Sequence, residues 1–267
     1  MSSPEPTSNP PSGPIYGPGN GDFFSELRLA ACFLTILPLG PRTSADDEAI
    51  AASFRWFPLV GFALGLVLAL EDYALGFLFL DRTVRATLLV LSLTVITGAV
   101  HLDGLADTAD ALGAGGNRER ALEILRDSRI GSFGAIAIFF ALALKVAALA
   151  AMPATTRYQA IIAAVGIARW SMVAVSSRSD YLRASGAGTS VLGFKEQFNT
   201  IGIATLTTGA ALISIHTLAV GAAFSTAIFM WPLLTLFYKR WLGGVTGDLI
   251  GACGELVEVA VLLVMSI

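Results

Sequence analysis

The sequence predicts an all-α protein, a polytopic bundle of about seven transmembrane helices with a short N-terminal interfacial or re-entrant helix. Apolar residues make up 55% of the 267 residues and charged residues only 14%, and the mean hydropathy is +0.71. A soluble domain does not carry such values, whereas a bilayer favours them. Long apolar segments favour helices over a barrel, because each segment in lipid must satisfy its own backbone hydrogen bonds.

The first 21 residues are rich in Pro, Gly and Ser, and no Lys or Arg precedes Arg28. This composition predicts a disordered tail over 1–21 and does not suggest a secretory signal peptide. The apolar run 29–39 that follows has only eleven residues and ends among prolines and glycine. It is too short to cross a bilayer, so we expect the interfacial or re-entrant helix there. Residues 22–267 are predicted to form a single transmembrane catalytic domain.

The rest of the chain divides into apolar segments that can cross about 30 Å of hydrocarbon as helices. They are 56–80, 84–100, 130–152, 158–177, the two halves of 200–238, and 248–267. The segment 200–238 has no Asp, Glu, Lys or Arg in 39 residues. As one helix it would be roughly 59 Å long, so we expect two spans with a tight turn near Gly221.

Basic residues are distributed unequally between the two sides of the predicted bundle. With seven spans, the loops on one side carry eleven Lys or Arg residues and those on the other side carry three, Arg82, Arg85 and Arg157. The positive-inside rule therefore places the first set of loops in the cytoplasm. The net charge of −3 gives no indication of a nucleic-acid partner.

Three aspartates form the first candidate site, at the cytoplasmic end of the segment 84–100. Asp103, Asp107 and Asp110 stand at i, i+4 and i+7, which on a helix spans an arc of about 60°. Carboxylates so arranged repel one another unless a cation intervenes. Mg²⁺ is the expected ion, since it binds a few carboxylates together with substrate phosphates. A solvated acidic helix face is the alternative.

The glycine- and arginine-rich stretch 113–134 is the second candidate site. Its glycines would let the backbone approach an anion, and its arginines can grip phosphate. A basic loop that only sets membrane topology would look similar. The candidate binding residues of this stretch are Arg118, Arg126, Ser128, Arg129 and Gly131.

Acidic residues in the last segment form the third candidate site. Asp248, Glu255 and Glu258 share one face of a predicted helix. Acids inside a membrane helix are energetically unfavourable, so they are expected to be functional or paired. Lys145 and Arg169, which interrupt two other apolar segments, are the available counter-charges.

Five motifs follow one another along the chain. They are FLTILPLG at 33–40, WFPLVG at 56–61, HLDGLADTADALG at 101–113, ILRDSRIGSFG at 124–134 and GGVTGDLIGACGE at 243–255. In order and spacing they resemble the cobalamin synthase family, the adenosylcobinamide-GDP ribazoletransferases, over essentially everything after residue 22. The segment 181–188 follows the family's Tyr-, Arg- and Gly-rich loop only loosely, which leaves its role open.

The resemblance implies a transferase of cobalamin (vitamin B12) biosynthesis in the bacterial cytoplasmic membrane. In the family, adenosylcobinamide-GDP is joined to α-ribazole or its 5′-phosphate with release of GMP, and the step depends on Mg²⁺. A ribose hydroxyl would attack the phosphorus nearer the cobinamide, which requires alignment and charge neutralisation. The expected partners are these small molecules and the lipid bilayer, with no nucleic acid, and homo-oligomerisation is left open.

In this scheme the three aspartates of the first site would hold one or two Mg²⁺ ions on the diphosphate. One of them, or Asp127, would act on the attacking hydroxyl as a base. Arg126 and Arg129 would hold phosphate oxygens. Asp248 and Glu255 would complete the metal site or position the corrinoid.

Two other functions remain open from the sequence. The Asp-Gly pair and the later acids alone also resemble the CDP-alcohol phosphotransferases, so a membrane transferase using a nucleotide-linked alcohol or a prenyl diphosphate would share the metal chemistry. An ion-coupled carrier could use Lys145, Arg169, Glu255 and Glu258 as a translocation path. A carrier predicts internal repeats, and we find no convincing repeat.

Overall fold

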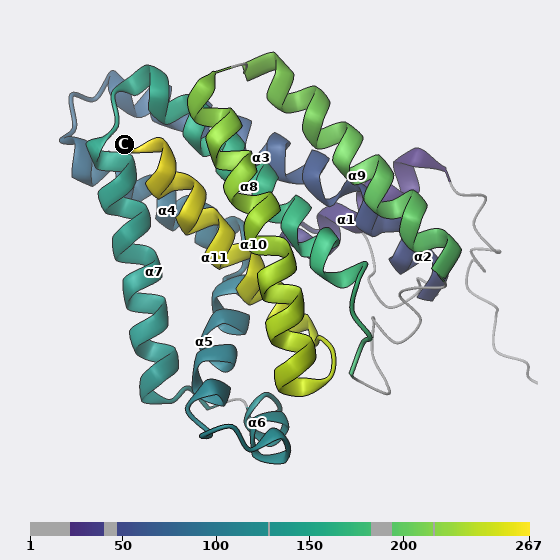
Figure 1. Cartoon of the computed structure of the whole chain (residues 1–267). Helices are drawn as coiled ribbons and strands as arrows, with labels where there is room; N and C mark the ends of the chain where they lie inside the picture. Colours follow the sequence, from purple (N-terminus) through teal and green to yellow (C-terminus); the bar gives the residue numbers. More distant parts are fainter. Residues whose placement is uncertain (1–21, 40–46, 128, 183–193, 216) are drawn as a thin grey trace, which may run out of the picture.

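The computed structural model describes residues 22–39, 47–127, 129–182, 194–215 and 217–267, so the predicted tail lies outside the described residues. Within these ranges the chain is helical and has no β-strand, which confirms the all-α class. Figure 1 shows the helices in one bundle. In order they are α1 (Phe23–Leu34), α2 (Asp47–Ser53), the 3₁₀ turn η1 (Phe54–Trp56), α3 (Phe57–Gly76), α4 (Arg82–Thr97), α5 (Val100–Leu112), α6 (Arg118–Ile124), α7 (Ser132–Ala151), α8 (Ala154–Ser176), α9 (Phe194–Ile215), α10 (Leu218–Leu242) and α11 (Gly247–Met265).

Fewer segments than predicted have the length and composition to cross a membrane. In the described part of the chain, four segments qualify, and α4 with α5 would make a fifth if they form one broken span. The four are Ala49–Gly76, Ser132–Ala151, Ala154–Ser176 and Leu218–Leu242. The predicted number of seven spans is therefore wrong, although the polytopic helical character is confirmed. Acidic residues interrupt α11, and the apolar part of α9 is only the segment Asn199–Ile215.

A right-angled break separates α4 from α5, close to the predicted end of the span 84–100. The two helices meet at 90°, and both Gly98 (φ 64°) and Ala99 (φ 57°) are left-handed. Gly98 suits this C-cap, because glycine adopts the left-handed region without strain. The extended residues 35–39 that follow α1 pack against the break, where the Ile36 amide donates a 2.9 Å hydrogen bond to the Ile96 carbonyl.

The long uncharged segment forms two helices, as predicted, but they are divided earlier than expected. α9 ends at Ile215 and α10 begins at Leu218, while Gly221 lies inside α10. The Thr217 hydroxyl caps α10 by accepting a 3.3 Å hydrogen bond from the Val220 amide. Threonine is a favourable N-cap residue, and glycine inside an apolar helix does not by itself end it.

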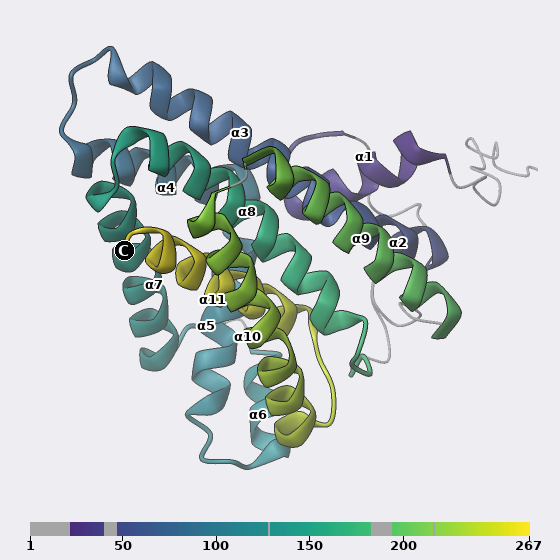
Figure 2. The ribbon, with the colours of Figure 1, turned by 45° about the horizontal axis from the view of Figure 1, so that its top comes forward.

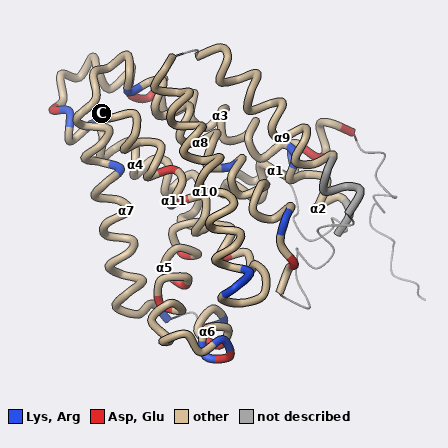
Figure 3. The backbone as a smooth tube through the Cα atoms, viewed as in Figure 1, with Lys and Arg blue, Asp and Glu red and all other residues tan. Residues whose placement is uncertain are grey.

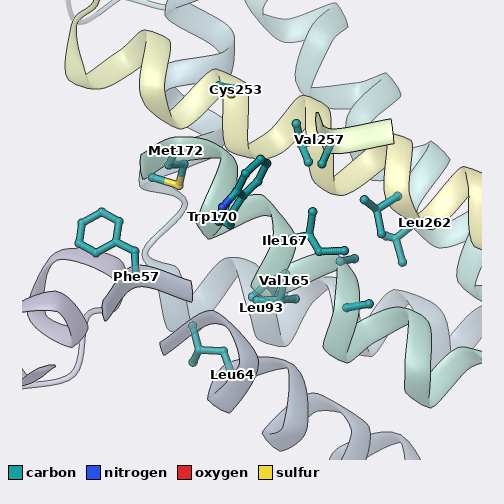
Figure 4. Packing of buried hydrophobic residues seen from close by; sticks show 14 of the residues in the cluster. Phe57, Leu64, Leu93, Val165, Ile167, Trp170, Met172, Cys253, Val257 and Leu262 are labelled. Carbon is teal, nitrogen blue, oxygen red and sulfur yellow. The ribbon is translucent and has the colours of Figure 1, made fainter. Parts of the chain in front are cut away.

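Helix α8 lies at the centre of the bundle (Figures 1 and 2), and 89% of the residues in its most apolar stretch are buried. It packs closely on α3 through Gly61 and Gly65, which are four residues apart. A Cβ atom added to Gly61 would lie 2.7 Å from the Val165 carbonyl oxygen, and one on Gly65 would lie 2.7 Å from the Ile162 Cα. Small residues at this spacing let two membrane helices approach backbone to backbone. The surrounding core is apolar (Figure 4).

Helices α7 and α10 expose apolar side chains on the outside of the bundle. Phe139 and Phe140 on α7 and Phe229 on α10 are 56–68% exposed. In the most apolar stretch of each helix, only 28% of the residues of α7 and 17% of those of α10 are buried. Figure 3 shows charged residues gathered around α6 and sparse along α7. Apolar surface of this extent is unfavourable in water and is matched to lipid.

Buried charges join α3, α4 and α8 at the end of the bundle opposite α6. The fully buried carboxylate of Asp72 accepts hydrogen bonds from Arg85 Nη2 at 2.6 Å and from Arg157 Nε at 2.7 Å. Arg157 is itself only 2% exposed. A buried charge requires such partners, so this cluster fixes the three helix ends together.

Candidate functional site

The crossing of α5 and α11 creates the candidate site. A Cβ atom added to Gly104 would lie 2.6 Å from the Asp248 carbonyl oxygen, and one on Gly251 would lie 3.3 Å from the His101 Cα. The two glycines therefore allow close backbone contact between helices that carry two different motifs. The contact places Asp103 and Asp248 on the wall of one cavity.

The cavity has a volume of about 260 Å³ and an uneven lining. Its polar wall combines the two carboxylates with hydroxyl-bearing residues from the end of α8 and the loop after it. Its apolar residues come from the end of α1, from η1 and the start of α3, from α5 and α8, and from α11 with the loop before it. The lining residues are Phe33, Leu34, Phe54, Phe57, Val100, His101, Asp103, Met172, Ser176, Ser179, Tyr181, Val245, Gly247, Asp248 and Ile250.

Two loops close the cavity by pairing with each other. The Val245 amide donates to the Asp180 carbonyl at 2.8 Å, and the Leu182 amide donates to the Val245 carbonyl at 2.9 Å. A Cβ atom at Gly244 would overlap the Asp180 carbonyl oxygen, so this position requires glycine. The sequence gives no signal of this contact, because the paired residues are more than 60 positions apart.

Thr246 orients Asp248 at the start of α11. Its hydroxyl accepts a 3.4 Å hydrogen bond from the Leu249 amide, as an N-cap, and donates to Asp248 Oδ2 at 3.2 Å. A carboxylate in the first turn is also stabilised by the partial positive charge of the helix N-terminus. Asp248, predicted as a substrate-binding residue, thus lies half-buried at the cavity.

The three aspartates of the first motif lie on α5, as predicted, but they do not face the same partner. Asp103 is exposed at the cavity, and Asp107 lies half-buried one turn further along. Asp110 accepts hydrogen bonds from the amides of Gly131 (2.7 Å) and Gly134 (2.9 Å), at the start of α7. Among the described residues, no group of three His, Cys, Asp or Glu side chains is arranged to hold a metal ion.

The glycines of the second motif therefore approach an anion, but the anion belongs to the chain. A Cβ atom on Gly131 or Gly134 would collide with the Asp110 carboxylate. Gly131, predicted to bind substrate, thus forms part of a helix cap. The anion that these glycine amides bind within the chain is the Asp110 carboxylate, and substrate binding by Gly131 stays a prediction.

The arginines of the second motif have different surroundings. Arg118 Nε donates a 2.8 Å hydrogen bond to the Leu242 carbonyl and so joins α6 to the end of α10. Arg126 is exposed and forms no ion pair within the described part of the chain. Ser128, also predicted to bind substrate, lies outside the described residues.

Asp127 and Arg129 form a bidentate pair on the surface. Arg129 Nη2 lies 2.6 Å from Asp127 Oδ2, and its Nε lies 3.0 Å from Oδ1. The hydrogen bonds from Arg129 lower the pKa of the Asp127 carboxyl below its ordinary value, and they raise the pKa of Arg129. A carboxylate with a lowered pKa is a weaker base, which argues against the expected role of Asp127 as the general base.

Glu255 lies away from the cavity lining, in a buried ion-pair network of α7, α8 and α11. Lys145 Nζ donates to Glu255 at 2.6 Å and to Glu258 at 2.7 Å, while Arg169 Nη1 donates to Glu258 at 2.5 Å. All four side chains are 7% exposed or less. The pairing predicted for these acids is confirmed, and the role of Glu255 toward substrate or metal stays a prediction.

Comparison with known proteins shows which family the chain belongs to. Residues 26–266 match the family model described as cobalamin-5-phosphate synthase. Relatives named adenosylcobinamide-GDP ribazoletransferase include those of Syntrophobacter fumaroxidans (39% identity, covering 90% of this chain and 97% of the relative) and Geotalea daltonii (38%, 89% and 95%). A relative from Roseiflexus sp. with the same name is 36% identical and covers 100% of this chain and 97% of its own length. No solved structure matches the chain. With five motifs in register and matches over nearly its whole length, the chain belongs to the cobalamin-5-phosphate synthase family.

Proposed function

We propose that the chain catalyses the reaction after which its relatives are named, the transfer that joins adenosylcobinamide-GDP to α-ribazole or its 5′-phosphate. The observation that carries the proposal is the placement of Asp103 and Asp248, from two separate motifs, on one cavity. A ribose hydroxyl of the acceptor attacks the phosphorus nearer the cobinamide. The bond to the bridging diphosphate oxygen breaks, GMP leaves, and the hydroxyl proton passes to a carboxylate.

The carboxylates at the α5–α11 crossing fit Mg²⁺ by their chemistry and number. Mg²⁺ is bound through one or two carboxylates together with substrate phosphates, so it does not require a complete cage of protein ligands. We assign this role to Asp103 and Asp107, on adjacent turns of α5. When bound, Mg²⁺ would supply charge neutralisation on the diphosphate. The hydrogen bonds of Asp110 give it a positioning role toward α7 instead.

The remaining steps depend on residues of the chain itself. Asp248 lines the same cavity as Asp103, and we assign it to orient the attacking hydroxyl and accept its proton. Exposed Arg126 is suited to phosphate oxygens, since guanidinium binds them through paired hydrogen bonds. Arg129 would do the same by exchanging its Asp127 partner for phosphate.

We further infer that the protein lies in the bacterial cytoplasmic membrane with the site on the cytoplasmic side. The loops that hold the motifs meet at one end of the bundle, where Arg118 contacts Leu242 and Tyr181 pairs with Val245. The excess of basic residues on these loops supports the orientation.

The direct test is GMP release by the purified, detergent-solubilised protein given adenosylcobinamide-GDP and α-ribazole 5′-phosphate. We expect release that requires the acceptor, stops with excess EDTA and returns with added Mg²⁺. Asp103→Asn should lower the rate by at least about 100-fold, while Glu123→Gln, at an exposed surface pair on α6, should leave it unchanged. Absence of acceptor-dependent release from monodisperse wild-type protein would instead direct attention to transferases of other nucleotide-linked alcohols.

A further inference from the structure

The cavity beside Asp103 and Asp248 has an apolar half that the transfer step itself does not require. This half is formed by Phe33 and Leu34 at the end of α1, Phe54 and Phe57 around η1, and Met172 on α8. Figure 4 shows Phe57 and Met172 at the same end of the core. The Phe54 and Phe57 rings stack with centroids 4.3 Å apart.

The apolar wall is held in place by polar contacts behind it. Trp56 Nε1 donates a 2.7 Å hydrogen bond to Glu26 on α1, and Arg55 Nε lies 3.6 Å from the same carboxylate. These bonds fix η1 against α1, so the aromatic rings from the two elements keep a defined spacing. A preformed pocket with a few polar groups and aromatic walls is typical of a site for a small organic ligand.

The diphosphate is excluded as the occupant of the apolar half of the cavity, because its negative charge would have no cationic side chain as a partner. Among the described residues that line the cavity there is no Lys or Arg, and the carboxylates of Asp103 and Asp248 are at its polar end. Size excludes the corrin ring, because pockets for drug-sized ligands are about 300–1,000 Å³ and this cavity is about 260 Å³. The occupant is therefore no larger than a nucleoside.

Hydrogen-bonding capacity separates the two nucleosides of the reaction. Guanine carries donors and acceptors around its edges, and the side chains of Phe33, Leu34, Phe54, Phe57 and Met172 offer them no hydrogen-bond partner, so burying guanine against these residues is unfavourable. A benzimidazole-type base has a fused carbocyclic ring without polar atoms, which matches the apolar wall. Its ribose would then point toward the polar half, where Ser179 Oγ is buried without a hydrogen-bond partner in the described structure.

We propose that the apolar half of the cavity binds the aromatic base of the acceptor nucleoside and selects bases whose buried edge is apolar. Phe54 and Met172 are the residues that set this selectivity. The inference rests on the proposed function, since the acceptor's chemistry comes from that reaction. It assigns the nucleobase to a place in the fold and leaves the donor's corrinoid outside the cavity.

The first experiment measures equilibrium binding of α-ribazole to the full-length, detergent-solubilised protein without any donor. Phe54→Ala removes apolar contact with the base and should weaken binding by at least about tenfold. Phe139→Ala, on the lipid-facing side of α7, is the matched control and should bind as the wild type does. Unchanged affinity in folded Phe54→Ala would overturn the inference, as would competitive displacement of α-ribazole by GMP at equal affinity.

The second experiment compares acceptors in the GMP-release assay. Met172→Gln places an amide at the apolar half, while Met172→Leu keeps it apolar. We expect the glutamine variant to lose the preference for a benzimidazole nucleoside over its purine analogue by about tenfold, and the leucine variant to keep it. The KM for the donor should stay within about twofold in both. A rise in donor KM with no change in acceptor preference would assign the pocket to guanine.

The two proposals fail in different ways. If the wild type binds α-ribazole through Phe54 but releases no GMP, the proposed reaction is wrong and the pocket assignment stands. If GMP is released but neither variant changes acceptor affinity or preference, the reaction stands and the pocket assignment is wrong.

Discussion

The carboxylate of Asp110 accepts a 2.7 Å hydrogen bond from the backbone amide of Gly131, 21 residues later in the chain. A second bond from the Gly134 amide completes the cap of α7. The last aspartate of the acidic motif therefore holds the start of another helix, while the first aspartate of the motif faces the cavity. This division of roles leads to the first prediction.

Asp110→Ala should reduce stability, because it leaves amides at the start of α7 without their acceptor. Loss of a side-chain cap lowers the free energy of unfolding by about 1 kcal/mol. Thermal unfolding in detergent would measure the change as a lower midpoint. Asp103→Ala, at an exposed position of the same helix, should keep the wild-type midpoint while losing activity. Equal midpoints in Asp110→Ala and wild type would contradict the capping role.

Lys145→Met should be strongly destabilising, because it leaves Glu255 buried beside Glu258 with no cation of its own. Removal of one partner from a buried ion pair typically costs about 3–5 kcal/mol. The double variant Lys145→Met with Glu255→Leu should recover part of the loss, since Glu258 keeps Arg169. Thermal unfolding of the single and double variants tests this order. A single variant as stable as the wild type would show that the network does not brace the bundle.

Gly104→Ala should impair both stability and transfer. The added Cβ atom would lie 2.6 Å from the Asp248 carbonyl oxygen, so α11 must shift and carry Asp248 with it. We expect kcat to fall by about tenfold or more, since small misplacements of reacting groups are costly. Gly221→Ala is the matched control, because no atom lies within 4 Å of its added Cβ. A wild-type kcat in Gly104→Ala would show that α5 and α11 can move apart at their crossing without loss of activity.

The activity should not depend on titration of Asp127 near neutral pH. Arg129 lowers the pKa of Asp127 below its ordinary 3.8, so the carboxylate stays ionised. Because the folded-state pKa of Asp127 is lowered, the ion pair makes its full contribution to folding stability above the ordinary pKa. This contribution is lost only as the pH falls through the lowered pKa. The pH–rate profile of Asp127→Asn should therefore keep the same midpoint for any acid limb above about pH 5. A displaced limb would restore Asp127 as the general base.

The sequence was most informative where physical chemistry acts locally. The spacing of Asp103, Asp107 and Asp110 correctly predicted one helix, and the rarity of buried charge correctly predicted partners for Glu255 and Glu258. The number of spans was wrong for two reasons: composition does not show the break between α4 and α5 at Gly98, and neither the short apolar part of α9 nor the acid-containing α11 qualifies as a span. Contacts between distant segments were also beyond its reach. The cavity is lined by the end of α1, η1, α8 and the loop before α11. Nothing in the sequence of any one of these segments predicts its contact with the others.

The network of Lys145, Arg169, Glu255 and Glu258 contains two cations and two anions, so its formal charges sum to zero. An electric field does work only on net charge that moves along it, which is about 2.3 kcal/mol per elementary charge per 100 mV. Because the cluster has no net charge and its ion pairs are short, it presents no net charge on which a membrane potential can do work. The network can thus lie inside a bundle of membrane helices without adding net charge to it.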